Sequence, residues 1–120
     1  MFLILFSFMF HGINKIISFR NLQHIIDICL ARNIKVVLGT YCHFLYENVK
    51  NSSIHRLYNE IIKEENTVIR DLAKTNNLDL VDNDSLIPRE EKYFLDSVHF
   101  TPEGMKLLAT NFSEVLINKI

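Results

Sequence analysis

Hydrophobic residues fall along the chain in two patterns, short continuous runs and longer segments with helical spacing. The first ten residues are nearly all apolar, and this run stops at His11-Gly12. Two later runs, Lys35–Leu38 and Leu78–Val81, are short and rich in Val and Leu. A short apolar run bounded by turn residues is typical of a strand that is buried on both faces of a parallel sheet. The pattern therefore predicts three strands, one in each run.

Three longer segments carry apolar residues at the spacing of an amphipathic helix. The first ends at Asn33, the second ends at Asn76-Asn77, and the third begins after Thr101. A threonine hydroxyl can cap a helix whose first residue is proline, which suits Thr101 and Pro102. The residues that we expect to face the core are Phe19, Leu22, Ile25, Ile26, Cys29 and Leu30, then Ile54, Leu57, Tyr58, Ile61, Ile62, Val68, Ile69 and Leu72, and last Met105, Leu108, Phe112, Val115 and Leu116.

Strands and helices alternate in this reading of the chain. Such alternation predicts right-handed crossovers and a parallel sheet covered by helices, here in a single domain over residues 1–120. Residues that follow parallel strands gather at one edge of the sheet. We therefore expect His11–Asn14, Thr40–His43 and the loop that ends at His99 to meet there. The segment 82–100 is predicted to be an irregular loop, with Asp82 as a turn residue.

The apolar start of the chain has more than one interpretation. A transmembrane helix needs roughly 18 or more apolar residues, and the run before His11 is shorter. A secretory signal would have a basic first region and a small-residue cleavage site, and neither is present. We favour a buried strand and keep a signal-like segment as the alternative. The compartment stays open, and the missing signal features favour a cytoplasmic location.

Charge and cysteine content narrow the range of partners. The formal net charge is −1 and acidic and basic residues are interspersed, so we expect no nucleic-acid partner held by phosphate contacts. Cys29 and Cys42 lack the spacing of metal ligands, as do the five histidines, so no metal or other cofactor is expected. A disulfide between the two cysteines has no support in the sequence, and a reducing compartment is the default expectation.

The strongest candidate for chemistry is the segment Asp96–Gly104, with the sequence DSVHFTPEG. A carboxylate three residues before a histidine, in a turn, can accept a hydrogen bond from the imidazole Nδ1. That contact fixes the tautomer, stabilises the imidazolium and leaves Nε2 free as a general base. Such a tetrad also occurs by chance in exposed loops, so its position matters. Here it follows the last predicted strand and opens the last predicted helix.

In that position the segment resembles the last conserved block of the SGNH (GDSL-type) hydrolases. That block has an Asp-x-x-His at the head of the terminal helix, and Asp96, His99, Phe100, Thr101 and Gly104 match it. The resemblance implies a three-layer α/β/α, flavodoxin-like fold with a parallel sheet. It also implies hydrolysis of ester or acyl bonds, with His99 as the general base and Asp96 as the acid that orients it.

Two further stretches are similar to the same family. Gly12-Ile13-Asn14 follows the apolar strand as the family's Gly-x-Asn does, which implies that the Asn14 amide donates into an oxyanion hole. Lys15 stands where the family usually has Asp, and an ordinary turn is the alternative interpretation. Residues 35–40 (KVVLGT) resemble the family's next strand and its threonine-bearing turn. Together these matches cover only the later half of a family domain, so we expect the fold to lack its first strands.

The family's Gly-Asp-Ser block, which carries the nucleophile, has no counterpart in this sequence. Ser7, Ser52, Ser53 and Ser97 do not have its strand-turn-helix setting. Without a nucleophilic serine no acyl-enzyme can form, so we expect this chain by itself to be inactive. Through the resemblance, the substrate class would be a small ester or an acylated carbohydrate or lipid.

Two explanations for the missing block stay open. The chain is either part of a longer esterase or a non-catalytic domain that binds a partner. The first explanation predicts an apolar sheet edge beside the first strand, through which the isolated chain would self-associate. The segment Tyr41–Phe44 also keeps two interpretations, because it either lines a substrate site or is a structural loop.

Overall fold

The computed structural model describes residues 1–6, 15–49 and 51–119. Its elements, in chain order, are β1 (Phe2–Phe6), α1 (Lys15–Ala31), β2 (Lys35–Gly39), α2 (Ser53–Asn76), β3 (Asp79–Val81), α3 (Asn83–Leu86), the short 3-10 helix η1 (Glu91–Tyr93) and α4 (Pro102–Ile117). The three predicted strands and the three predicted long helices are thus present, although the predicted segment 7–10 of the first strand lies outside the described residues.

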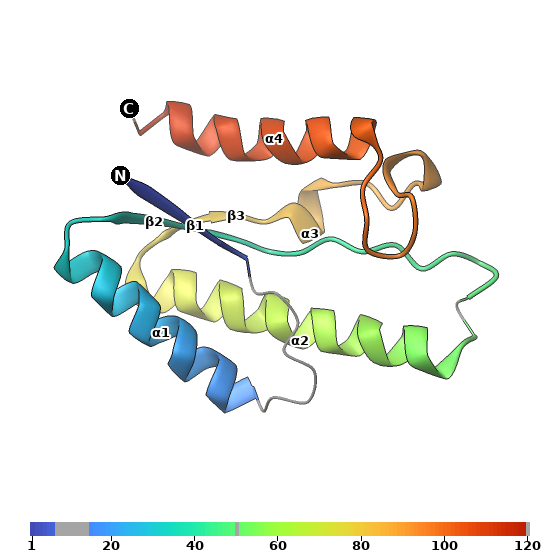
Figure 1. The fold of residues 1–120 in the computed structure, drawn as a ribbon, viewed down its shortest axis with the longest axis horizontal. Coiled ribbons are helices and arrows are strands. Elements are labelled where there is room, and N and C mark those ends of the chain that lie inside the picture. The colour runs from blue at the N-terminus through green and yellow to red at the C-terminus, as the bar shows by residue number, and fades with distance from the viewer. Residues whose placement is uncertain (7–14, 50, 120) are drawn as a thin grey trace.

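The described strands form one parallel sheet in the order β1-β2-β3. Phe2 of β1 lies opposite Lys35 of β2, and Val37 of β2 lies opposite Asp79 of β3. Figure 1 shows α1 and α2 on one face of this sheet and α4 on the other. The predicted three-layer α/β/α architecture with a parallel sheet is therefore confirmed. β1 is an edge strand of the described sheet, and self-association through that edge stays a prediction.

Local sequence explains where the helices begin and end. The residues Asn33 and Asn77, just beyond α1 and α2, have φ values of 55° and 51°. Asparagine adopts this left-handed conformation more readily than most residues, and it ends a helix there. At the start of α4, the Thr101 hydroxyl accepts a hydrogen bond from the Gly104 amide at 3.2 Å. The predicted cap and both predicted helix ends are thus confirmed.

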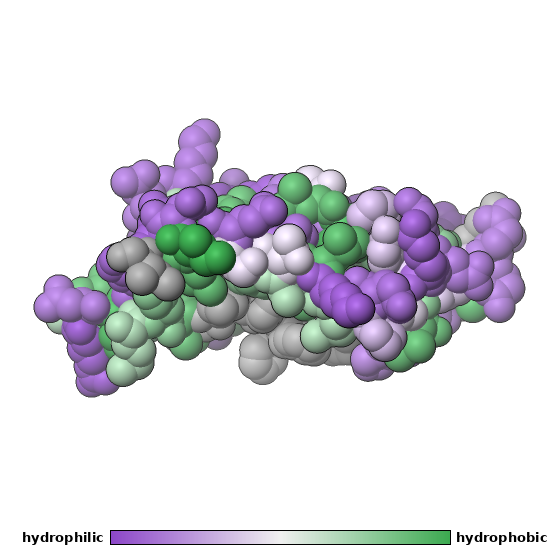
Figure 2. All heavy atoms as spheres, turned by 90° about the horizontal axis from the view of Figure 1, so that it is seen from above, coloured by the Kyte–Doolittle hydropathy of each residue, from purple (hydrophilic) through white to green (hydrophobic). Residues whose placement is uncertain are grey.

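The core has one cluster on each face of the sheet. The larger cluster, between the sheet and the helices α1 and α2, consists of Ile26, Cys29, Val36, Leu38, Val68, Ile69, Leu72 and Ala73. On the other face, Phe112 of α4 packs with Val37 and Val81 of the sheet. Seen from the α4 side, hydrophobic residues are interspersed among hydrophilic ones on the surface (Figure 2).

Part of the predicted core is wrong. The side chains of Ile25, Leu30, Ile54, Leu57 and Met105 are all at least 40% exposed. The 24 residues of α2 span about 36 Å, whereas a five-residue strand spans only about 17 Å. The first turns of α2, which carry Ile54 and Leu57, therefore extend beyond the strands (Figure 1). In α1 the contact with the core is narrower than the apolar stripe, and it centres on Ile26 and Cys29.

The segment 82–100 is more regular than the predicted loop. It contains α3 and η1, because local hydrogen bonds satisfy its backbone groups. The Asp82 carbonyl accepts from the amides of Ser85 and Leu86, each at 3.0 Å.

No helix among the described residues is both long enough and apolar enough to cross a membrane.

A pair of isoleucines on α1 tests this division between core and surface. Ile26 is fully buried, whereas Ile28 is 54% exposed. We expect Ile26→Ala to lower the free energy of unfolding by about 2–5 kcal/mol, because it leaves a cavity in the larger cluster. Ile28→Ala should change it by less than about 1 kcal/mol. Urea unfolding of both variants measures the difference, and equal losses would contradict the described packing of α1.

Candidate active site

A short hairpin at the carboxyl edge of the sheet carries Asp96 and His99. Phe94 and Phe100 pair in antiparallel fashion at its base, and the Leu95 amide donates to the His99 carbonyl at 2.8 Å. The hairpin runs directly into α4. Gly104 permits this close junction, because a Cβ at that position would lie 2.2 Å from the Tyr93 carbonyl oxygen.

Asp96 and His99 contact each other at the tip of this hairpin. Oδ2 of Asp96 lies 2.7 Å from Nδ1 of His99, so Nε2 is the ring nitrogen left for other partners. Oδ1 of Asp96 accepts from the amides of Val98 and His99 at 2.9 and 2.8 Å. The Val98 amide, followed by the His99 side chain, holds the pKa of Asp96 below its usual range. The structure thus brings the two predicted residues together, and their catalytic role stays a prediction.

The pair is open to solvent. The His99 side chain is 71% exposed and the Asp96 side chain is 57% exposed. An ion pair in that environment contributes little stability, typically about 0–1 kcal/mol. The geometry of the pair is therefore set by the backbone that carries it rather than by attraction between the two side chains.

Residues 41–46, which follow β2, support this hairpin. The Phe44 amide donates to the Ser97 carbonyl at 3.0 Å. The Tyr41 hydroxyl donates to the Val98 carbonyl, and the Tyr46 hydroxyl donates to the Phe94 carbonyl at 2.7 Å. The Phe44 ring stacks on Phe94 with 5.3 Å between centroids. The structural interpretation of Tyr41–Phe44 is thus supported by three contacts, two from Phe44 and one from Tyr41.

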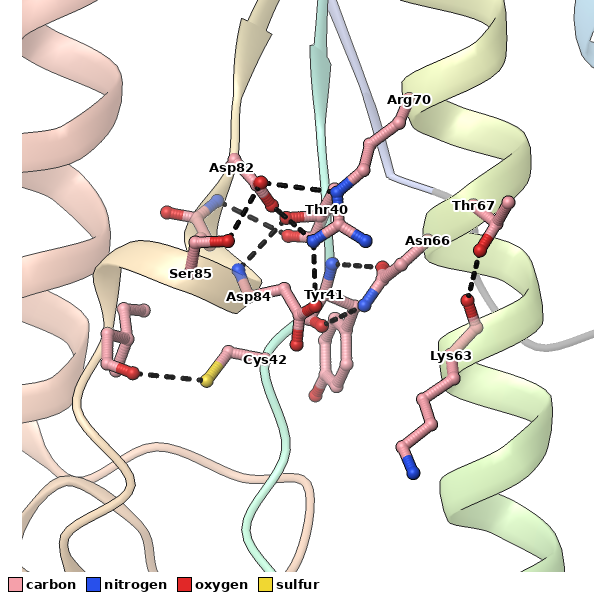
Figure 3. Close-up of polar contacts among 12 residues, drawn as sticks. Thr40, Tyr41, Cys42, Lys63, Asn66, Thr67, Arg70, Asp82, Asp84 and Ser85 are labelled. Carbon is pink, nitrogen blue, oxygen red and sulfur yellow. Dashed lines mark hydrogen bonds and ion pairs between the residues drawn. The ribbon is translucent and has the colours of Figure 1, made fainter.

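The same residues are tied to α2 by side-chain amides. Asn66 is 2% exposed, and its Oδ1 accepts from the Tyr41 amide at 2.8 Å while its Nδ2 donates to the Tyr41 carbonyl at 2.7 Å (Figure 3). About two turns closer to the start of α2, Asn59 bonds to Nε2 of the buried His43. Burial lowers the pKa of His43, and the bond to Asn59 opposes this only in part. His43 is therefore neutral at ordinary pH.

A charged cluster joins the segments after β2 and β3 to Arg70 of α2 (Figure 3). The Arg70 guanidinium donates to both oxygens of Asp82, at 3.1 and 2.7 Å, and to Asp84 at 2.7 Å. The Thr40 hydroxyl donates to Asp82 at 2.7 Å. Burial would raise the pKa of Asp82, but hydrogen bonds from Arg70, Thr40 and Ser85 outweigh it and hold that pKa below its usual range. Asp82 is therefore not merely a turn residue.

Two hollows are lined in part by residues of the hairpin, and Val98 lines both. The larger, of about 460 Å³, is lined by Thr40, Tyr41, Cys42, Leu95, Val98, His99, Phe100, Met105 and Leu108. The smaller, of about 240 Å³, lies toward α2 and is lined by His43, Leu45, His55, Tyr58, Ile62, Asp96, Ser97 and Val98. Both are mostly apolar, and the larger one has the size of a small-molecule site.

The remaining predicted residues have mixed outcomes. Thr40–His43 lies beside the His99 loop as predicted, whereas His11–Asn14, including the predicted oxyanion donor Asn14, lies outside the described residues. Cys29 and Cys42 are free and buried, and burial raises the pKa of the Cys42 thiol to about 11. In the part of the chain that the structure describes, no three His, Cys, Asp or Glu side chains are grouped to hold a metal ion.

The sequence analysis missed Asn66 and the Arg70 cluster. The signal for Asn66 was present, because it lies between Ile62 and Ile69 on the apolar stripe of α2. A polar residue on a buried helical stripe needs a hydrogen-bond partner. The partners of Arg70, Asp82 and Asp84, follow β3 and lie 12 and 14 positions along the chain, and nothing in the local sequence specifies that meeting.

Comparison with solved structures places this geometry in a known fold. A GDSL-like lipase from Bacteroides thetaiotaomicron aligns with 91% of this chain at a TM-score of 0.69 and 20% identity. An acetyl xylan esterase aligns with 95% at a TM-score of 0.73 and 21% identity. A member of the lipolytic G-D-S-L family from Veillonella parvula aligns with 95% at a TM-score of 0.71 and 16% identity. This is the fold of the SGNH hydrolases.

The chain covers only part of that fold. It spans 55%, 66% and 62% of the lengths of these three proteins, respectively. No protein-family model matches the sequence, and no curated protein matches it either. The similarity to these proteins therefore lies in how the helices and strands are arranged, and it concerns the fold alone.

Breaking the Arg70 cluster should cost more stability than breaking an exposed ion pair. Arg70→Met leaves Asp82 and Asp84 without their guanidinium, and we expect a loss of about 1–3 kcal/mol at pH 7, since the Arg70 side chain is 34% exposed. Lys119→Met, which breaks the exposed pair with Asp79, should cost less than about 1 kcal/mol. Urea unfolding gives both values, and equal losses would contradict the role of the cluster.

The same cluster predicts a pH dependence. The pKa of Asp82 is lower in the folded chain than its ordinary value of 3.8. Its carboxylate therefore contributes stability above pH 3.8, and that contribution is lost as the pH falls through the folded pKa. We expect the difference between Arg70→Met and the unmodified chain to shrink below pH 3.8. A difference that stays constant to the acid limit of folding would show that Asp82 is not the group involved.

Proposed function

We propose that this chain carries the acid–base half of a serine-type hydrolase of ester or acyl bonds. The observation that carries the proposal is the 2.7 Å contact between Oδ2 of Asp96 and Nδ1 of His99, at the head of α4 in an SGNH hydrolase fold. The contact leaves Nε2 on a largely exposed ring, where a nucleophile and a substrate can approach. His99 is the general base and Asp96 is the acid that orients it.

The chemistry follows from these positions. Nε2 of His99 takes the proton of a nucleophilic hydroxyl as its oxygen bonds to the ester carbonyl carbon, and the Asp96 carboxylate stabilises the imidazolium. The imidazolium then gives that proton to the leaving alcohol as the ester C–O bond breaks. Water releases the acyl group by the same two steps. Asn14, which directly precedes α1, is proposed as a donor to the carbonyl oxygen.

The nucleophile is proposed to come from outside the described residues. In the described ranges no serine hydroxyl bonds to His99. Instead, Ser18 donates to Glu65, Ser85 to Asp82 and Ser113 to the Thr110 carbonyl, and the Ser97 hydroxyl lies 3.5 Å from His55. Cys42 is no substitute, since its raised pKa keeps the thiol protonated at neutral pH.

The hollow beside His99 supports an ester with an apolar portion as the substrate. Leu95 and Met105 line it and are 68% and 51% exposed, so both side chains are accessible to the apolar portion of a bound ester. The structural neighbours include a GDSL-like lipase and an acetyl xylan esterase, whose names point to lipids and to acetylated carbohydrate. We propose a small ester, or an acylated carbohydrate or lipid, as the substrate class.

A second candidate is a non-catalytic domain that binds a partner. The observation in its favour is that His99 has no serine partner among the described residues. In that case His99→Ala would leave partner binding unchanged, because the imidazole would have no chemical role.

Hydrolysis of a chromogenic acetate ester decides between the two. The 120-residue chain is compared with the product of the whole gene that encodes it, after the upstream codons are read for a Gly-Asp-Ser block. We expect the chain by itself to match its His99→Ala variant. The product that contains the block should be active and should lose about 10³-fold or more in kcat on His99→Ala.

His24→Ala is the matched control, because His24 is an exposed histidine of α1. It should leave turnover unchanged. The proposal fails if the gene encodes no such block and the chain has no turnover, which leaves the binding domain. It also fails if His99→Ala keeps full activity, or if a serine-reactive phosphonate labels the isolated chain in a His99-dependent way.

A further inference from the structure

The two peptide units between Ser97 and His99 are held from both sides. On one side their N–H groups, those of Val98 and His99, donate to Oδ1 of Asp96 at 2.9 and 2.8 Å. On the other side their carbonyls accept from the segment after β2. The Phe44 amide donates to the Ser97 carbonyl at 3.0 Å, and the Tyr41 hydroxyl donates to the Val98 carbonyl.

A peptide unit is planar, so its carbonyl and its N–H cannot be oriented independently. The Val98 carbonyl and the His99 amide belong to one such unit. When the Tyr41 hydroxyl holds the carbonyl, it also directs the His99 N–H toward Oδ1 of Asp96. A bond at the carbonyl further polarises the N–H at the other end of the unit. The phenol therefore acts on the Asp96 carboxylate without contacting it.

Tyr41 itself is well fixed. Asn66 holds both its backbone amide and its carbonyl, at 2.8 and 2.7 Å, as Figure 3 shows. Its ring lies 6.3 Å from the ring of Phe100, which is next to His99 in the chain. Burial, and after it the charge of Asp96, raises the pKa of the Tyr41 phenol. The hydroxyl therefore stays protonated and remains a donor throughout the range in which His99 could act as a base.

We propose that Tyr41 is a positioning residue for the Asp96–His99 pair, acting through the Val98–His99 peptide. Its hydroxyl sets the plane of that peptide, and the plane sets where the Asp96 carboxylate sits when it faces Nδ1 of His99. The catalytic meaning of this arrangement rests on the proposed function. The arrangement itself can be tested without any turnover.

Two tyrosines on the same segment give a matched pair of variants. Tyr41→Phe and Tyr46→Phe each remove one hydroxyl that donates to a carbonyl of the same hairpin. Tyr46 bonds to Phe94 at the base of the hairpin, two residues before Asp96 and outside the two peptide units that Asp96 holds. Both variants of the full chain are titrated by following the Asp96 carboxyl carbon by NMR, with thermal unfolding recorded alongside.

We expect Tyr41→Phe to shift the pKa of Asp96 upward, toward its ordinary value, because the Val98 and His99 amides lose their fixed direction. Tyr46→Phe should leave the pKa of Asp96 unchanged at a similar cost in thermal stability. An unchanged pKa in Tyr41→Phe, or equal shifts in the two variants, would overturn the proposal. The second result would mean that any loosening of the hairpin has the same effect.

If Tyr41→Phe does not fold, the unmodified chain still decides. The Tyr41 hydroxyl proton should then be seen as a slowly exchanging NMR signal with a scalar coupling, across the hydrogen bond, to the Val98 carbonyl carbon. A hydroxyl that exchanges freely with water would overturn the proposal. None of these readouts depends on ester hydrolysis, so the positioning role and the proposed function can fail separately.

Discussion

The paired hydrogen bonds between Asn66 and the backbone of Tyr41 are the constraint on which the site depends. β2 ends at Gly39, and the chain then leaves the sheet with part-buried backbone groups at Tyr41 that need partners. The Asn66 side chain supplies a donor and an acceptor at 2.7 and 2.8 Å, as a neighbouring strand would. Leaving either group unpaired would cost about 1–3 kcal/mol. From this anchor, residues 41–46 reach across to the hairpin that carries Asp96 and His99.

Stability and the proposed chemistry rest on different charged groups. Arg70, Asp82 and Asp84 form a partly buried cluster that ties strand ends to α2. Asp96 and His99 are exposed, and their mutual attraction is too weak in water to fix their geometry. Catalytic groups must nevertheless be held in place before the reaction, since alignment itself lowers the barrier. For the proposed catalytic pair, we infer that this alignment comes from the hydrogen bonds that Tyr41, Phe44 and Tyr46 donate to the hairpin.

The sequence was sufficient for much of the fold but not for the support of the site. Alternating runs predicted the three strands and three long helices, and Asn33, Asn77 and Thr101 marked helix boundaries through local conformation. Burial failed at Ile54 and Leu57, because it depends on how far the sheet extends beside the helix. The contacts of Tyr41 with Asn66 and Val98 join residues 25 and 57 positions apart, and no local pattern encodes them. Asp96 and His99 were found because their contact is local.

The most direct test of this account is the protonation of the His99 ring, read from its two nitrogen-15 chemical shifts in the unmodified chain. The account predicts that the neutral ring carries its proton on Nδ1, bonded to Asp96, with a bare Nε2. A neutral ring protonated on Nε2, or one that exchanges between both forms, would contradict it, because His99 would then have no oriented base to offer a nucleophile.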